Sequence, residues 1–379
     1  KENEFNFFAY SADRNWLVST GENRYNFSIL FNAGNPVGTT FRNNTSTQRS
    51  FKNITRIELV KCILPVEGVD VMIDISGTSN AFKSTLNTNA LSFPYLMVYT
   101  PELDNNNTGT NYNLDNAFGV IQYDANWISD NNYASQRGGY IAMIPKFMKC
   151  QKVYYPTPLS TLQKITVRIQ RPDGSLLSAV PDTLTVSGLT MSQFITGANQ
   201  GALNYYVGND SLGAGASRYI WIQTSTWFSR YMFNVGDRIQ LQGLNFTTTI
   251  TGAANVGTAP ADLLNFLQNP QGLLVVNIGY TAGAGPIYYS GPNNVGYANY
   301  IIVDARYTDP TVSGSTAISP FGGTTAAGTA LNTAISGVAG VFTSPNGGVI
   351  NLSHQTQVVF RIITRDMDAA SRLRPDNLN

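Results

Sequence analysis

Apolar and polar residues alternate most clearly in the first half of the chain. The stretch 25–31 (YNFSILF) carries large apolar residues at every second position, and 165–170 (ITVRIQ) repeats the pattern with polar residues between. This period of two is typical of half-buried strands in an antiparallel sheet. Turn-rich stretches such as 104–109 and 171–174 separate the runs. Further strands are predicted at 57–64, 95–99, 118–123 and 140–144. Residues 1–174 therefore predict a β sandwich or barrel.

The composition changes after residue 174. Residues 175–349 contain ten charged side chains, whereas the other 204 of the 379 positions contain 37. Strand-like runs still interrupt this segment, at 219–223, 238–241, 273–278 and 300–303. A short helix is expected at 260–267, which begins with Pro260 and is followed by Pro270. The segment predicts a second β-rich unit with long polar loops.

The last strong strand pattern lies at 357–364 (QVVFRIIT) and resembles those of the first half. A single strand cannot bury itself, so we expect this one to return to the first sheet. Residues 175–349 would then be an insertion between two late strands. The expected divisions are a first part at 1–174, the insertion at 175–349, a closing strand at 350–365 and a polar tail at 366–379.

The balance of charges limits the partners of the chain. It has 24 basic and 23 acidic residues, a net charge of +1, and 12% of its residues are charged, against ~25% in ordinary globular domains. This argues against direct binding of nucleic acid or of an anionic membrane. No run reaches the ~18 apolar residues of a membrane span, and no signal peptide is expected. Much of the surface of 175–349 is expected to be covered by neighbouring molecules, the alternative being a free surface rich in Asn and Thr.

Residues that carry catalytic chemistry are few. His354, between Ser353 and Gln355, is the sole histidine, so a His-rich metal site is impossible within this chain and a catalytic triad would need this residue. Neither a nucleophile elbow nor a phosphate-binding glycine motif is present. Cys62 and Cys150 lack the spacing of metal ligands. We expect both to be reduced and buried, with a single disulfide as the alternative.

Carboxylates are the remaining candidates for chemistry. Calcium would suit the Asp and Asn residues at 104–107 and 124–130, but the spacing of an EF-hand is absent and turn formation explains them. For glycoside hydrolysis, which needs two acids close together, the nearest candidates are Asp13, Asp70, Asp74, Asp366 and Asp368. All of these have turn or strand contexts that favour a structural role. The sequence predicts no cofactor, no metal ion and no enzyme.

Three parts of the chain form a recognisable set. They are 11–16 (SADRNW) with 23–28 (NRYNFS), then 51–65 (FKNITRIELVKCILP), and lastly 154–159 (YYPTPL) with 162–169 and 171–174 (RPDG). Together they resemble the opening, the next strand block and the late strand-and-turn of virion proteins from nucleocytoplasmic large DNA viruses. The resemblance implies a single jelly roll that serves as a minor capsid or penton protein. In those proteins the closing strand follows soon after the turn, whereas here 175 residues intervene.

The expected function is that of a structural virion protein, assembled in the host cytoplasm. As a minor capsid protein of a large icosahedral DNA virus it would stabilise the shell through contacts with the major capsid protein and other minor capsid proteins. A penton at the five-fold vertices, and so a homo-oligomer, is a close variant. The alternatives are a carbohydrate-binding β module of the lectin kind and a polysaccharide-degrading enzyme using Glu67, Asp70 or Asp74.

Two candidate contact surfaces follow from this expectation. One is the polar tail at 366–379. The other comprises aromatic residues of the insertion, each with burial inside its own unit as the alternative. These residues are Trp221, Trp227, Phe228, Tyr231, Tyr288 and Tyr289.

Overall fold

A computed structural model shows an all-β chain. The structure describes residues 2–19, 21–31, 46–47, 50–65, 70–73, 82–86, 90–103, 107–108, 110–127, 140–146, 148–179, 181–192, 219–229, 232–244, 267–281, 287–289, 297–304 and 347–365. The short helical elements are η1 (Ser11–Asp13), η2 (Ala90–Ser92), α1 (Tyr112–Asp115) and η3 (Leu352–His354). Strands pair antiparallel throughout these ranges, except for two residue pairs between β2 (Asn26–Phe31) and β3 (Ser46–Thr47).

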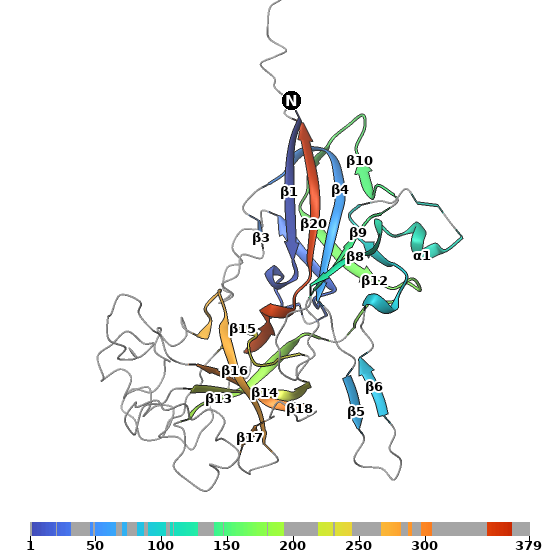
Figure 1. Cartoon of the computed structure of the whole chain (residues 1–379). Helices are drawn as coiled ribbons and strands as arrows, with labels where there is room; N and C mark the ends of the chain where they lie inside the picture. The colour runs from blue at the N-terminus through green and yellow to red at the C-terminus, as the bar shows by residue number, and fades with distance from the viewer. Residues whose placement is uncertain are drawn as a thin grey trace, which may run out of the picture.

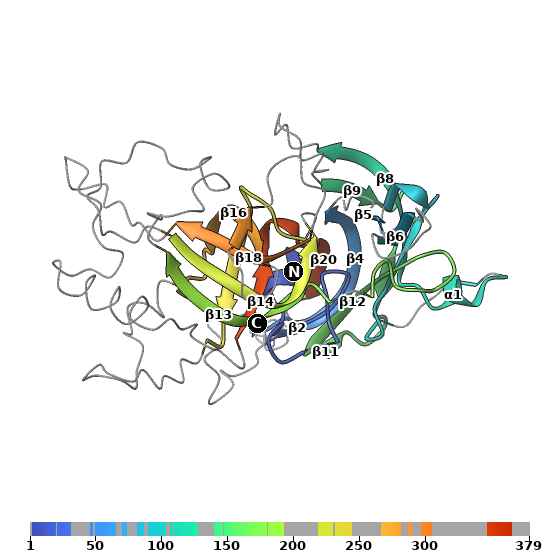
Figure 2. The ribbon, with the colours of Figure 1, turned by 90° about the horizontal axis from the view of Figure 1, so that it is seen from below.

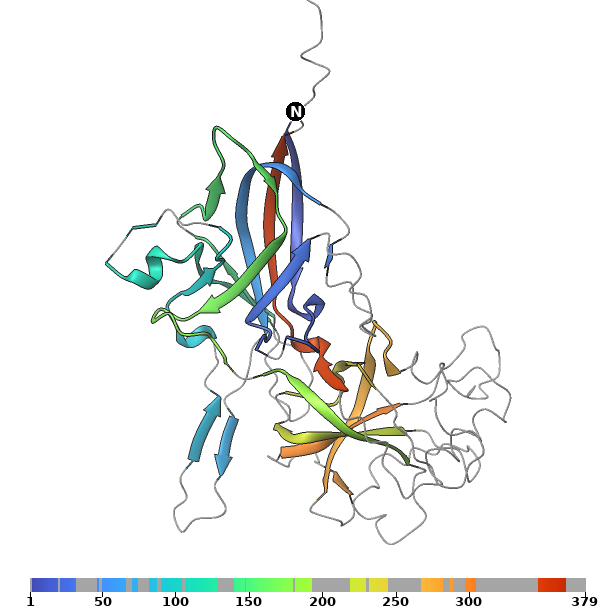
Figure 3. The same ribbon diagram turned by 180° about the vertical axis from the view of Figure 1, so that it is seen from behind.

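The first sheet combines the N-terminal half of the chain with its last strand. Besides β2 and β3 it contains β1 (Glu2–Tyr10), β4 (Lys52–Pro65), β7 (Leu96–Tyr99), β8 (Gly119–Trp127), β9 (Tyr140–Ile144), β10 (Gln151–Val153), β11 (Leu159–Thr161), β12 (Lys164–Gln170) and β20 (Gln357–Arg365). The strand order is β1-β20-β4-β9-β8-β7-β12-β2-β3, and β10 and β11 also pair with β4. Figure 1 shows β1, β20 and β4 side by side, and Figure 3 shows β2 on the opposite side of the unit.

Both ends of this strand path contribute to one hydrophobic core. Alternate residues of β20 (Val358, Phe360 and Ile362) belong to the same buried cluster as alternate residues of β12 (Ile165, Val167 and Ile169). The ring of Phe7 on β1 lies 4.8 Å from that of Phe31 on β2. The sheet therefore folds back on itself, and the period of two in the sequence marks the residues that face the shared core.

A second sheet is built from strands that lie between β12 and β20 in the sequence. They are β13 (Thr183–Ser192), β14 (Tyr219–Ser229), β15 (Arg238–Gln242), β16 (Leu273–Thr281), β17 (Ile287–Tyr289), β18 (Tyr297–Asp304) and β19 (Gly348–Asn351). Their order is β15-β19-β13-β14-β18-β16-β17, and β15 also pairs with β16. The six strands other than β17 thus close into a ring in which each strand pairs with two others. Figure 2 shows β13, β14, β16 and β18 grouped apart from β4, β8 and β9.

The second sheet has its own core. Its cluster of buried side chains includes Phe228, Phe233 and Ile301, and the rings of the two phenylalanines lie 5.3 Å apart at 69°. A separate hairpin joins β5 (Asp70–Ile73) and β6 (Phe82–Leu86). The described part of the chain therefore contains two hydrophobic cores, one formed by each sheet.

The strands predicted from the sequence are confirmed, among them β2, β4, β9, β12, β15 and β20. The predicted turn at 171–174 is also confirmed, because the amide of Gly174 donates to the carbonyl of Arg171 and Gly174 has a φ of 84°. β1 and β13 are among the strands that the sequence did not predict. The helix expected at 260–267 lies, apart from Leu267, outside the described residues.

The two cysteines lie in the first core. Cys62 and Cys150 are both free and buried. Burial raises the pKa of each thiol, since desolvation disfavours the thiolate, and for Cys62 the charge of Cys150 adds to the effect. The expectation of reduced, buried thiols agrees with this arrangement.

Candidate functional site

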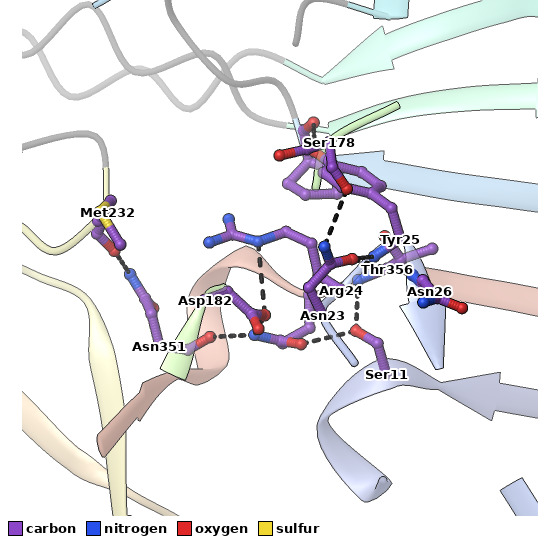
Figure 4. Close-up of polar contacts among 12 residues, drawn as sticks. Ser11, Asn23, Arg24, Tyr25, Asn26, Ser178, Asp182, Met232, Asn351 and Thr356 are labelled. Carbon is purple, nitrogen blue, oxygen red and sulfur yellow. Dashed lines mark hydrogen bonds and ion pairs between the residues drawn. The ribbon is translucent and has the colours of Figure 1, made fainter. Parts of the chain in front are cut away.

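Within the described residues, a group of buried polar side chains lies where the two sheets meet. The chain crosses from the first sheet to the second between β12 and β13 and returns between β19 and β20. η1 and the turn around Asn23, both near the start of the chain, lie against these two crossings (Figure 4). We call this group the polar junction; its members are Ser11, Arg14, Asn23, Arg24, Asp182, Asp237, Asn351, His354 and Gln355.

The centre of the polar junction is the ion pair between Arg14 and Asp182. One guanidinium nitrogen of Arg14 contacts the Asp182 carboxylate, and both side chains are almost wholly inaccessible to solvent. Arg24 Nε lies 3.6 Å from the other carboxylate oxygen of Asp182. Burial lowers the pKa of the Arg14 guanidinium, and the Asp182 carboxylate opposes that shift. The two arginines and the carboxylate therefore form a compensated buried group that links the first sheet to the start of β13.

Gln355 extends this group to the second crossing. Its Oε1 accepts hydrogen bonds from Ser11 Oγ (2.6 Å) and from Arg14 Nη1 (3.2 Å). Its Nε2 donates to the carbonyl of Asn351 (2.7 Å). The Ser11 amide in turn donates to the carbonyl of Thr356, and the Thr356 amide donates to Ser11 Oγ. The side chain of Gln355 thus ties η1 to the segment that enters β20.

A third set of contacts fixes β19 within the second sheet. Asn351 Nδ2 donates to Asp237 Oδ2 (2.8 Å) and to the carbonyl of Met232 (2.6 Å). His354 Nε2 lies 3.9 Å from Asp237 Oδ1, and both side chains are buried. Asn23 Nδ2 donates to the carbonyl of Ser178 at the first crossing. Polar contacts therefore continue from the first sheet into the interior of the second.

Close packing accompanies the polar contacts. Trp16 is buried, and a Cβ added to Gly348 on β19 would lie 2.9 Å from Trp16 Cζ3 and 3.1 Å from Leu17 Cδ1. Only glycine allows β19 to approach the indole ring this closely. The second sheet therefore packs against Trp16 and Leu17, which follow β1 in the sequence.

The polar junction is suited to a structural role. Its hydrogen bonds join residues up to 345 positions apart in the sequence, and both side chains of the ion pair are almost wholly shielded from solvent. A shift of one sheet against the other would separate these buried charges, and an unpaired buried charge is costly. Ser353 Oγ accepts from the Arg238 amide and so is engaged as a structural acceptor next to His354.

The aromatic residues expected to form a contact surface have different environments. Phe228 is fully buried in the second core, so its side chain is not offered to a partner. Trp227, the preceding residue, is 49% exposed. Trp221 lies on β14, and Tyr288 and Tyr289 lie on β17. Tyr231 and the tail at 366–379 lie outside the described residues.

Few of the candidate carboxylates fall in the described part of the chain. Asp13 lies on η1 and Asp70 begins β5, while Glu67, Asp74, Asp366 and Asp368 lie outside. Of the two stretches considered for calcium, 104–106 is outside and Asp124 lies on β8. Searched across the described ranges, no three His, Cys, Asp or Glu side chains gather as a metal site.

The residues of the polar junction were not singled out from the sequence as a site. Asp182 is the first charged residue of the charge-poor segment 175–349, and this isolation was the available signal. A lone carboxylate in an otherwise uncharged stretch is a candidate for a buried, paired charge. The Arg14 partner, 168 positions earlier, could not be inferred from spacing.

Comparison with known proteins adds no family to this description. No protein-family model matches the chain, and no curated protein is similar to it at a significant level. Among the described helical segments, none has the length and apolar character needed to cross a membrane.

Proposed function

We propose that the chain is a structural virion protein: a minor capsid protein that stabilises the shell of a large icosahedral DNA virus. It does so through contacts with the major capsid protein and other minor capsid proteins in the virion. A penton at the five-fold vertices is the close variant. The fold, the seating of the second sheet and the low charge of the chain support this proposal.

The strand order is the observation that carries the proposal. Eight of the strands, in chain order, are β1, β2, β4, β7, β8, β9, β12 and β20. One half of the sheet consists of β1, β20, β4 and β9, which are the first, eighth, third and sixth of these strands. The other half consists of β2, β12, β7 and β8, which are the second, seventh, fourth and fifth. This interleaving is the order of a jelly roll, a fold that recurs in viral capsid proteins and in lectins. The similarity of 11–28, 51–65 and 154–174 to virion proteins favours the capsid role.

The position of the second sheet supports an assembly role. It is inserted between the last two strands of the proposed jelly roll, where a long connection leaves the core undisturbed. The polar junction connects it to the first sheet, so that a neighbouring protein bound to either sheet also restrains the other sheet. A charge-poor surface lowers the repulsion between closely packed copies.

Binding to pre-formed shells tests this function. The purified chain is mixed with shells assembled from the major capsid protein of the same virus and sedimented. Saturation at a fixed molar ratio to the major capsid protein is expected, and no saturable co-sedimentation would contradict the proposal. Light scattering of the free chain distinguishes the variants, since a discrete pentamer is expected only of a penton.

The carbohydrate-binding alternative is favoured by one observation. Trp227 is 49% exposed at the end of β14, and exposed aromatic rings stack on sugars. A glycan array probed with the intact chain tests it. Binding that is lost in Trp227→Ala would support the lectin, whereas a blank array leaves the capsid role as the account of this fold.

A further inference from the structure

An open pocket of ≈ 570 Å³ lies where the outer face of the first sheet meets the segment that enters β20. Three of the residues that line it, Tyr10, Gln357 and Ile63, stand in register on β1, β20 and β4. Their sequence neighbours Ala9, Val358 and Leu64 belong to the first core, so these three face away from it. The lining of the pocket is mainly apolar and aromatic.

Two tyrosine side chains that line the pocket are held in place by hydrogen bonds. The Tyr10 hydroxyl donates to the carbonyl of Leu352 (2.8 Å), and the Tyr140 hydroxyl donates to the carbonyl of Ser353. Both hydroxyls are therefore bound to η3, and both tyrosines line the pocket. Phe8, 55% exposed on β1, adds a third aromatic side chain. Because the tyrosines are held by these hydrogen bonds, the pocket is formed before a ligand arrives.

One carboxyl group, that of Asp13, also lines the pocket. Neighbouring groups crowd this exposed side chain, and the resulting desolvation raises its pKa to about 6. The two arginines that follow it in the sequence, Arg14 and Arg24, both bind Asp182 instead. Within the described ranges, no hydrogen bond or ion pair engages Asp13. At neutral pH this carboxylate is therefore mostly ionised beside three aromatic rings, and none of the described cations pairs with it.

We propose that this pocket binds the basic side chain of another protein chain, with arginine as the preferred residue. A guanidinium group pairs with a carboxylate through two parallel hydrogen bonds and also stacks on aromatic rings. The aliphatic stem of the side chain packs on Ile63 and the rings while the cation reaches Asp13. Charge complementarity identifies the occupant, and this assignment stands whether or not the chain is a capsid protein.

A pair of ligands that differ only in charge tests the assignment. The intact chain, labelled on its tyrosine rings, is titrated with Nα-acetyl-arginine methylamide and with the corresponding citrulline derivative, whose urea group is neutral. The arginine derivative is expected to shift the signals of Tyr10 and Tyr140 saturably, with a Kd on the order of 1 mM. The citrulline derivative is expected to bind at least about tenfold more weakly. Equal binding of the two, or no saturable shift, overturns the proposal.

Two variants test whether the Asp13 carboxylate binds the arginine. Asp13→Asn keeps the shape of the side chain and is expected to weaken arginine binding by about tenfold or more. Asp173→Asn alters an exposed carboxylate in the 171–174 turn and is expected to change nothing. Affinity in the parent should also fall below pH 6, since Tyr10 and Tyr140, the other titratable groups that line the pocket, do not ordinarily ionise there. An unchanged affinity in Asp13→Asn contradicts the role of the carboxylate.

A last experiment distinguishes two possible occupants of the pocket, a partner protein and the C-terminal tail of this chain. Residues 366–379 contain Arg372 and Arg374. The titration is repeated on the chain that ends at residue 365. The same affinity with and without the tail is expected for a pocket that serves another protein. Binding that appears only after truncation would assign the pocket to the tail and overturn the assignment to a partner.

Discussion

Arg14 and Asp182, 168 positions apart in the sequence, form a buried ion pair between the two sheets. Arg14 follows the first strand of the first sheet, and Asp182 precedes the first strand of the second. Each charge is compensated chiefly by residues of the other sheet or of the crossing segments. The relative placement of the two units therefore depends on this pair.

Replacement of Asp182 by alanine is expected to lower the free energy of unfolding by about 3–5 kcal/mol. The change leaves the Arg14 guanidinium buried without its main partner, which is the costly way to break a buried pair. Urea unfolding followed by tryptophan fluorescence measures the effect, because Trp16 is buried beside β19. Asp173→Asn is the control and should leave the midpoint nearly unchanged. An Asp182→Ala variant as stable as the parent would contradict the structural role of the polar junction.

The sequence predicted strands better than it predicted the arrangement of residues around them. Alternation identified β2 and β12 because one face of each is buried in the first core. It failed for β1, where Phe8 is 55% exposed between the buried residues Phe7 and Ala9, so that apolar residues on both faces obscured the period of two. β13 contains Gly188 at a break in register, which gave it the appearance of a polar loop.

The return of the last strand was predictable, whereas the polar junction was not. A strand as apolar as 357–364 needs partners, and the nearest similar strands were at the start of the chain. The pairing of Arg14 with Asp182 depends instead on how two separate sheets meet. Sequence spacing carries no information on such a contact, so three-dimensional structure was needed to find it.

Asp13→Asn is expected to stabilise the chain above pH 6. The pKa of Asp13 is about 6 in the folded chain and near 3.8 when unfolded, so the folded state holds this proton more tightly. Stability from this group is therefore greatest below pH 3.8 and falls as the pH rises through 6. The difference in melting temperature between variant and parent, measured from pH 4 to pH 8, should grow in favour of the variant. A difference that is flat with pH would show that Asp13 is not desolvated.

Gly348→Ala is expected to destabilise the chain by about 1–3 kcal/mol, because the new methyl group meets the Trp16 ring. Gly21→Ala is the matched control, since no atom lies within 4 Å of its added Cβ. Thermal unfolding of both variants measures the difference. Combining Gly348→Ala with Trp16→Phe should cost less than the sum of the two single changes. Strict additivity would mean that the two residues do not share a contact.

The neighbouring residues Phe228 and Trp227 separate core packing from surface contact. Phe228→Ala is expected to cost about 3–5 kcal/mol of stability, because it empties a fully buried site beside Phe233. Trp227→Ala should change the unfolding midpoint far less, since that side chain is half exposed. If the exposed ring contacts a neighbour in the shell, Trp227→Ala should weaken co-sedimentation with shells. A stable variant that co-sediments normally would remove Trp227 from the contact surface.

The proposed role of this chain is that of a structural part of a viral shell. An electron cryomicroscopy reconstruction of purified virions tests it most directly. The account predicts density into which both sheets fit as one rigid body, held by the polar junction and in contact with at least two neighbouring capsid proteins. A shell with no such density, or density that projects from the surface on a single attachment, would contradict it.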